Sequence, residues 1–138
     1  YEIAKWVWQG IKTIMVRESS ISRSLKEAIA LVVSNNNSCS YCVGVHTMSL
    51  KAVGMDLKKI EELNQDYHAS DISEKEKAIL DFALKITNES YKIYEKDHEE
   101  LKTKYGLTEQ QIFEIVTVAS AFNFINRFVD ALGTELEN

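Results

Sequence analysis

Apolar residues recur every three or four positions along most of the chain, a spacing that is typical of amphipathic helices. Residues 3–16 carry such a stripe, and a more apolar helix is expected over residues 21–34. The polar run at 35–38, which holds three consecutive asparagines, is expected to be a loop. No strand-like alternation bounded by turn residues occurs. The pattern therefore predicts an all-helical chain.

Helix ends are marked by capping residues and glycines. Residues 39–53 are predicted to form a helix that ends at Gly54, and residues 56–64 a shorter one. Three later starts match the capping box, in which an N-cap side chain pairs with a Glu or Gln three residues on. These pairs are Ser73 with Glu76, Asp97 with Glu100, and Thr108 with Gln111. They predict helices over 74–90, 98–105 and 109–132, the last ending at Gly133, and a bundle of six or seven helices in all.

Length and composition fit one folded domain over residues 1–138. Hydrophobic residues make up 45% and charged residues 27% of the chain, and 16 basic against 21 acidic residues give a net charge of −5. Because no basic block interrupts this acidic balance, nucleic acid and anionic membranes are unfavourable partners. The longest uncharged stretch, residues 28–50, holds asparagines and a histidine and is not expected to span a membrane. No targeting segment is visible, and we expect a cytoplasmic protein.

The only two cysteines, Cys39 and Cys42, are too close in sequence to staple a fold and resemble a reactive pair. On a helix, both sulfurs and the imidazole of His46 point within an arc of about 60°. A cysteine at a helix start is also exposed to the positive end of the helix dipole, which favours thiolate over thiol. This spacing predicts a compact redox face.

Glu27 lies in the apolar helix before the asparagine run and is predicted to be buried, so that its carboxylate needs a partner. It lies ~12 Å back from the loop along its helix, and His46 lies ~10 Å along the next helix from Cys39. In an antiparallel helix pair the two side chains would be level, and the carboxylate would fix the imidazole tautomer for proton transfer to or from a thiol. Alternatively, Glu27 forms a capping box with Ser24.

Metal ligation is the main alternative for the cysteine pair. The two cysteines and His46 could supply three zinc ligands, with Glu27 or His68 as the fourth. A second ligand pair of the kind that completes most structural zinc sites does not occur in the sequence. Attachment of c-type haem requires His directly after the second cysteine, where this chain has Val43. The sequence therefore favours redox chemistry without metal or cofactor.

The spacing of these residues resembles a known signature. Glu27, eleven residues, Cys39, two residues, Cys42, three residues and His46 is similar to the alkylhydroperoxidase D signature of the carboxymuconolactone decarboxylase superfamily. The segment 122–133 resembles the closing helix of the peroxidase-related branch of this superfamily. The resemblance covers most of the chain from Leu25 onward.

This resemblance implies an all-α antioxidant protein, a homo-oligomer of three or six subunits, that reduces hydroperoxides through a disulfide cycle. It assigns Cys42 to attack on the peroxide through a sulfenic acid, and Cys39 to resolution of that acid as a disulfide. Glu27 and His46 map to the proton relay. No metal or haem is implied, and a thiol reductant or a reductase protein would regenerate the dithiol.

One departure and two alternatives remain. Some members carry a histidine immediately before the second cysteine, where this chain has Tyr41, which implies slower proton transfer or a different substrate. Physical reasoning alone leaves the order of attack open, because Cys39 is closer to the helix start and Cys42 is closer to His46. The alternatives are a zinc-binding or redox-sensing module without turnover, and a decarboxylase or lactone-type enzyme that uses Glu27 and His46.

Other polar and aromatic residues are weaker candidates for chemistry. Arg127, beside Asn126 in an aromatic helix segment, is expected to pair with an acid or an anion, to reach solvent from a helix face, or to bind a neighbouring subunit. Four aromatic residues are expected to lie in the core or in a subunit interface, and these are Trp6, Trp8, Tyr91 and Tyr94.

Overall fold

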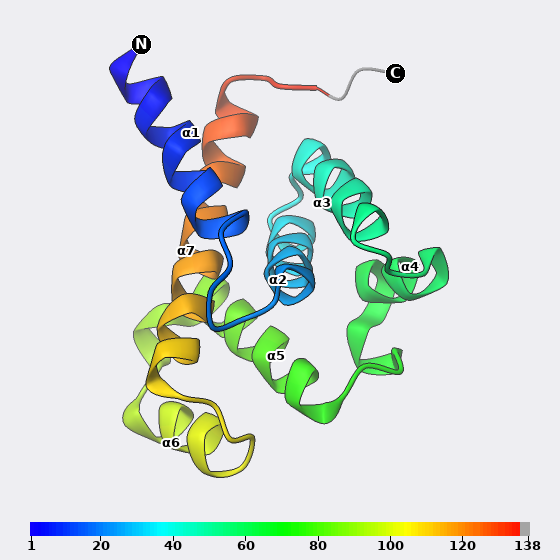
Figure 1. Ribbon diagram of the computed structural model, residues 1–138, viewed down its shortest axis with the longest axis vertical. Helices are drawn as coiled ribbons and strands as arrows, with labels where there is room; N and C mark the ends of the chain where they lie inside the picture. The colour runs from blue at the N-terminus through cyan, green and yellow to red at the C-terminus, as the bar shows by residue number, and fades with distance from the viewer. Residues whose placement is uncertain (136–138) are drawn as a thin grey trace.

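The computed structural model describes residues 1–135, and these form an all-α bundle without strands (Figure 1), as predicted. The seven α-helices are α1 (Glu2–Met15), α2 (Arg23–Asn36), α3 (Ser40–Ala52), α4 (Leu57–Asp66), α5 (Glu74–Glu89), α6 (Glu95–Thr103) and α7 (Glu109–Ala131). Two short 3₁₀ helices, η1 (Tyr67–Ala69) and η2 (Ser90–Lys92), follow α4 and α5.

Helix α2 is the centre of the bundle. It begins at Ser22, whose hydroxyl accepts a hydrogen bond from the backbone N–H of Leu25 at 3.1 Å and so caps the first turn. All nine residues from Lys26 to Ser34 are buried, because the helix contacts α1, α3, α4, α5 and α7. A helix that is buried on every side must be surrounded by other helices in this way.

Helix α1 forms one side of the molecule, beside the C-terminal part of α7 (Figure 1). Its apolar stripe faces α2 and α7, and Met15 at its end is buried. Trp6 and Trp8 are 70% and 66% exposed, and Tyr91 and Tyr94 on other elements are exposed as well. Of the two places expected for these aromatics, the structure excludes the core, and a subunit interface stays a prediction.

Several helix boundaries differ by one to three residues from those expected, and two of these differences have a local cause. Asn35 and Asn36 continue α2, so the loop before Cys39 is two residues shorter than predicted. Helix α6 begins at Glu95 and not at residue 98, because the Asp97 carboxylate accepts the Tyr94 backbone N–H at 2.8 Å from inside the first turn. Asp97 is thus the closing residue of a capping arrangement and not its first one.

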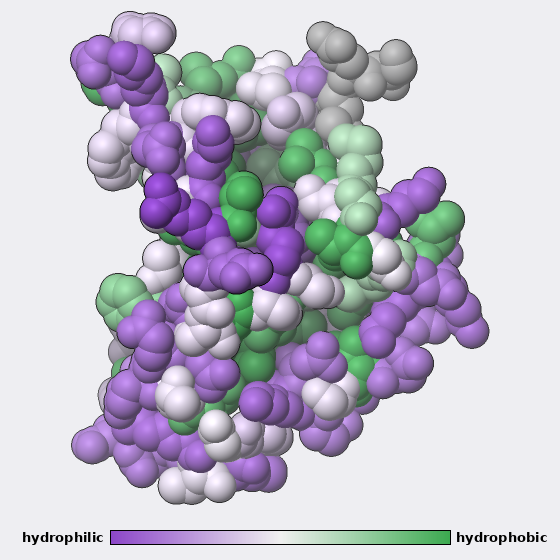
Figure 2. Space-filling view, viewed as in Figure 1, coloured by the Kyte–Doolittle hydropathy of each residue, from purple (hydrophilic) through white to green (hydrophobic). Residues whose placement is uncertain are grey.

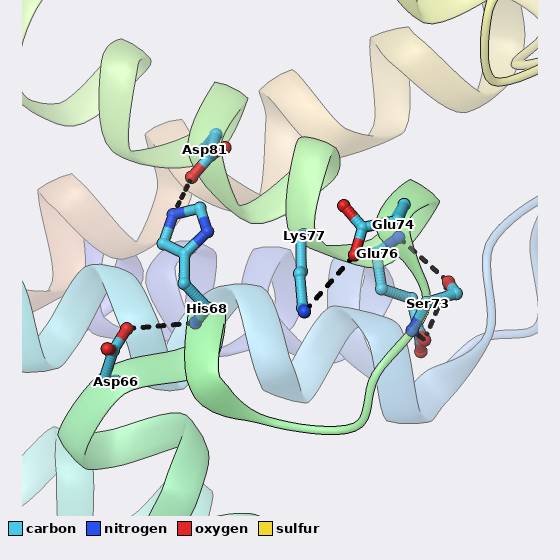
Figure 3. Close-up of polar contacts among 7 residues, drawn as sticks. All are labelled: Asp66, His68, Ser73, Glu74, Glu76, Lys77 and Asp81. Atoms are coloured by element: carbon cyan, nitrogen blue, oxygen red, sulfur yellow. Dashed lines mark hydrogen bonds and ion pairs between the residues drawn. The ribbon is translucent and has the colours of Figure 1, made fainter.

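The two other capping boxes form as predicted, at Ser73 and Thr108. Figure 3 shows the first of them at the start of α5, where Ser73 and Glu76 bond each other's backbone N–H groups. The same view shows that His68 on η1 points toward α5, where its Nε2 lies 2.7 Å from an Asp81 carboxylate oxygen. These contacts tie the connection after α4 to α5.

Among the described residues, α7 alone has the length and apolar composition of a membrane-crossing helix. It packs against α2 and α5 and also contacts α1, α3 and α6. Its composition is therefore explained by its place in the bundle, where Ile115, Val118 and Phe122 are buried in the common core.

Truncation of a side chain in the centre of α2 tests how far the fold depends on this helix. Leu31 is fully buried, so Leu31→Ala should lower the free energy of unfolding, measured by urea denaturation, by about 2–5 kcal/mol. Leu57→Ala is the matched control, because Leu57 is half exposed and its truncation should cost about 0.5 kcal/mol or less. Equal losses for the two variants would contradict a core centred on α2.

Candidate active site

The two cysteines lie where the chain turns from α2 into α3. Cys39 is the N-cap residue of α3 and Cys42 lies in its first turn, and the two form a disulfide with their Cα atoms 5.3 Å apart. Both side chains are buried. The start of α3 thus presents a cysteine pair that can exist as disulfide or dithiol, next to the unpaired N–H groups of a helix N-terminus.

Glu27 and His46 meet between α2 and α3. The imidazole Nδ1 lies 2.6 Å from the Glu27 Oε2, and because an ionised carboxylate only accepts, the imidazole N–H is the donor. Glu27 is 2% exposed and His46 is 6% exposed. With Nδ1 engaged in this bond, proton exchange with any other group falls to Nε2, which is the arrangement that a relay requires. The antiparallel pairing expected from the sequence brings these two residues level.

Two further residues complete the surroundings of this pair. Arg23, one turn before Glu27, donates from Nε to the Glu27 Oε1 at 2.9 Å, so that both carboxylate oxygens are bonded. The His46 and Phe122 rings pack in a T-shaped pair, with ring centroids 4.5 Å apart and planes at 86°. The alternative capping box with Ser24 does not form, because Ser22 caps the helix. Arg23 was detectable in the sequence only from its i,i+4 spacing to Glu27.

A pocket of about 460 Å³ opens onto this site, and its walls come from α1, α2, α3 and α7. In the space-filling view, a hollow with hydrophobic residues at its base lies between α1 and α3 (Figure 2). Tyr41, Cys42, Glu27 and His46 contribute to the wall, and most of the remainder is apolar. These apolar residues are Ala4, Val7, Trp8, Ile11, Met15, Val16, Val45, Phe122, Ile125, Phe128 and Val129. Helix α1, which carries none of the predicted site residues, thus supplies one side of the pocket.

The pocket distinguishes the two cysteines. Cys42 belongs to its wall, whereas Cys39 does not and is fully buried behind it. A molecule bound in the pocket therefore reaches Cys42 first. This difference in access depends on where α1 and α7 pack and could not be derived from the spacing of the cysteines.

His68, which the sequence offers as a further zinc ligand, lies on η1 and is paired with Asp81 of α5. Within residues 1–135, no three His, Cys, Asp or Glu side chains come together in a group that could hold a metal ion. The two sulfurs are bonded to each other in this structure.

Arg127 and Asn126 have separate environments. Arg127 is exposed and donates to the backbone and side-chain oxygens of Asn123 on its own helix, at 2.9 and 3.4 Å. Of the roles expected for Arg127, the structure fits a side chain that lies along its helix surface. Asn126 is fully buried and bonds residues at the end of α2.

Comparisons with known proteins place the fold in a family. Residues 3–66 match the family "Carboxymuconolactone decarboxylase family". The uncharacterized protein YdfG of Bacillus subtilis (strain 168) is 29% identical over 139 residues, which cover 96% of this chain and 91% of that protein. An uncharacterized peroxidase-related protein from Silicibacter sp. TM1040 is 30% identical and superposes with a TM-score of 0.92, covering 97% of this chain and 70% of that one.

Two more distant structures share the fold. The alkylhydroperoxidase AhpD core of an uncharacterized peroxidase-related protein from Ralstonia eutropha JMP134 is 24% identical, with a TM-score of 0.93, and the match covers 99% of this chain and 72% of that one. The debrominase Bmp8, solved with 2,3,4-tribromopyrrole, is 23% identical with a TM-score of 0.83, and the match covers 99% of this chain and 71% of that one. The chain therefore belongs to the carboxymuconolactone decarboxylase superfamily and has its alkylhydroperoxidase D-like fold.

Proposed function

We propose that this protein is a thiol peroxidase that reduces organic hydroperoxides through a Cys39–Cys42 disulfide cycle. The observation that carries the proposal is the position of Cys42 in the pocket wall, one helical turn from His46. The His46 ring is hydrogen-bonded to the buried Glu27. A nucleophile, a base and a group that orients the base are the parts that thiol chemistry at neutral pH requires.

In the proposed first step, the Cys42 thiol passes its proton to His46, and the thiolate attacks the peroxide. An S–O bond forms, the O–O bond breaks, and the leaving alkoxide takes the proton from His46 and departs as an alcohol. Cys42 is oxidised to a sulfenic acid while the peroxide is reduced by two electrons. Glu27 stabilises the imidazolium that exists between the two proton transfers.

In the second step, the Cys39 thiol attacks the Cys42 sulfur. The S–S bond forms, the S–O bond breaks, and the leaving hydroxide takes the proton that Cys39 gives up, so that water is released. The product is the disulfide present in the structure. Two thiols of an external reductant, either a small thiol or a reductase protein, then return the pair to the dithiol. We place this cycle in the cytoplasm, where such reductants keep thiols reduced.

The pocket supports an organic substrate in preference to hydrogen peroxide itself. Its wall is dominated by aliphatic and aromatic side chains, and burial of apolar surface in it would contribute about 25 cal/mol per Å² to binding. Hydrogen peroxide offers no such surface. Consumption of cumene hydroperoxide with dithiothreitol as reductant should therefore exceed that of hydrogen peroxide at equal concentration, and Cys42→Ser should abolish both. Activity that survives in Cys42→Ser would instead favour acid–base chemistry at Glu27 and His46.

We also propose that the protein is a homo-oligomer, a trimer or hexamer, that uses the outer face of α1. This face presents Ile3 and Trp6, and the Trp6 ring meets the half-exposed Phe124 of α7 edge-on, with centroids 6.5 Å apart. Large exposed apolar patches of this kind mark contact surfaces. A second copy of the chain is the occupant that fits the oligomers implied by the family.

The difference in access predicts which cysteine reacts first with an alkylating agent. After reduction, Cys42 should be modified by iodoacetamide at least about tenfold faster than Cys39, because only Cys42 lines the pocket and because a base lies one turn away. Peptide mass spectrometry at short reaction times measures the ratio. Faster modification of Cys39 would reverse the assigned roles.

The relay predicts a loss of rate without a loss of fold. Glu27→Gln and His46→Ala should each slow thiol oxidation by cumene hydroperoxide about 10²- to 10⁴-fold in stopped-flow measurements, because proton transfer is removed while the sulfur remains. His68→Ala is the matched control, since His68 on η1 pairs with Asp81 on α5, away from the pocket. Thiol oxidation in this variant should be as fast as in the wild type. Circular dichroism checks that the variants are folded, and wild-type rates in both relay variants would exclude the relay.

The oligomer is tested by a charge placed on the α1 face. Trp6→Glu should convert the assembly into smaller species in sedimentation velocity, because a carboxylate in an apolar contact is costly to desolvate. Tyr91→Glu, at a similarly exposed aromatic on η2, should leave the sedimentation coefficient unchanged. A wild-type protein that sediments as a monomer would contradict the proposal.

A further inference from the structure

The turn between α2 and α3 determines where Cys39 lies. At the end of α2, the Ser38 N–H donates to the Asn35 carbonyl at 3.1 Å, and the Cys39 N–H donates to the Ser34 carbonyl at 3.0 Å. This pair of bonds is the Schellman arrangement, in which the first residue past the cap adopts a left-handed conformation. After α3 that position is Gly54, with φ 94°, but after α2 it is Ser38, with φ 58°.

A left-handed serine is sterically less favourable than a glycine, so the turn depends on contacts with the rest of the protein. Asn126 of α7 provides two of them and is 1% exposed. Its Nδ2 donates to the Ser34 Oγ at 2.9 Å, and its Oδ1 accepts from the Asn37 Nδ2 at 2.9 Å. A single amide thus holds Asn37, which precedes Ser38, and Ser34, whose backbone carbonyl accepts the Cys39 N–H.

The hydrogen bonds continue from Asn37 to α7 and α5. The Asn37 Nδ2 also donates to the Asn123 Oδ1 at 2.9 Å, and the Asn123 Nδ2 donates to the Thr87 Oγ1 of α5 at 3.0 Å. Both hydrogens of the Asn37 amide are therefore used, and the turn is tied to two other helices. Since these helices belong to the core, the turn is fixed relative to the whole bundle and not only to α2 and α3.

We infer that Asn126 is a positioning residue for Cys39, and that it sets the equilibrium between the dithiol and the disulfide. In the disulfide the Cys39 and Cys42 Cα atoms lie 5.3 Å apart, and bond formation requires them to stay close to such a distance. In the reduced protein no bond enforces this distance, and a turn held by Asn126 keeps the two thiols at a high effective concentration. Loss of the amide frees the turn mainly in the dithiol state, so that the disulfide becomes easier to reduce. The inference rests on the proposed cycle only in that the pair must change redox state.

The experiment is a thiol–disulfide exchange with dithiothreitol. One protein disulfide and one reduced dithiothreitol give one protein dithiol and one oxidised dithiothreitol, so two electrons and two protons move to the protein. In Asn126→Ala this equilibrium should shift about tenfold toward the protein dithiol, equivalent to a rise of about 30 mV in reduction potential. Ser34→Ala removes one of the two bonds and should give a smaller shift in the same direction.

Two controls separate positioning from a general loss of stability. Asn88→Ala removes an amide that bonds Asn36, inside α2 and outside the turn, and should leave the exchange equilibrium unchanged. Ser38→Gly, added to Asn126→Ala, should restore the equilibrium at least in part, because glycine adopts the left-handed conformation without the support of Asn126. No reaction with peroxide is needed, so the outcome is independent of whether the protein turns over hydroperoxides.

An unchanged exchange equilibrium in Asn126→Ala, with equal losses of unfolding free energy in the oxidised and reduced proteins, would overturn the inference and leave Asn126 a purely structural residue. If Asn126→Ala does not fold, Ser34→Ala decides in the same way. A shift in Asn88→Ala as large as that in Ser34→Ala would also count against a specific role of the turn.

Discussion

A buried carboxylate at the centre of the molecule is the constraint on which the site depends. Glu27 lies in α2, which is packed against five other helices. An unpaired charge buried there would cost several kcal/mol. Arg23 and His46 each take one of its oxygens. The bond to His46 joins α2 to α3 at a fixed level, so the same interaction that satisfies the carboxylate also directs the imidazole toward the pocket that Cys42 lines.

The remaining architecture supports that pair from two sides. On one side, α1 and α7 form an apolar wall of the pocket, and the ring of Phe122 packs on the imidazole of His46. On the other side, Asn37 connects the cysteine turn to Asn126 and Asn123 of α7, and Asn123 continues the connection to Thr87 of α5. The site is therefore assembled from local bonds within the α2–α3 pair and from long-range contacts made by α7, the last helix.

The helices and the central pair could be predicted from the sequence because both depend on local spacing. Apolar periodicity and capping residues gave the number of helices, and the antiparallel geometry of short-looped helices brought Glu27 level with His46. Asp97 was misassigned because a carboxylate three residues into a helix and one at its cap share the same local pattern. The bond from Arg23 to Glu27 has one signal in the sequence, the i,i+4 spacing of the two residues.

Features that depend on tertiary packing could not be predicted from the sequence. The contribution of α1 to the pocket, the packing of Phe122 on His46 and the bonds from Asn126 to Ser34 and Asn37 join residues far apart in the chain. Helical periodicity indicates that a residue faces inward but does not indicate which residue it meets there. The exposure of Trp6 and Trp8 could not be predicted for the same reason, since an aromatic residue on a helix can face the core, a partner or solvent.

The most direct test of the account counts thiols. Reduced protein is mixed with one equivalent of cumene hydroperoxide, and free thiols are then alkylated and counted by intact mass spectrometry. The account predicts that wild-type protein loses both thiols together, that Cys39→Ser is trapped with Cys42 as a sulfenic acid, and that Cys42→Ser keeps its thiol. Wild-type protein in which both thiols stay reduced would contradict a peroxidase cycle at this site.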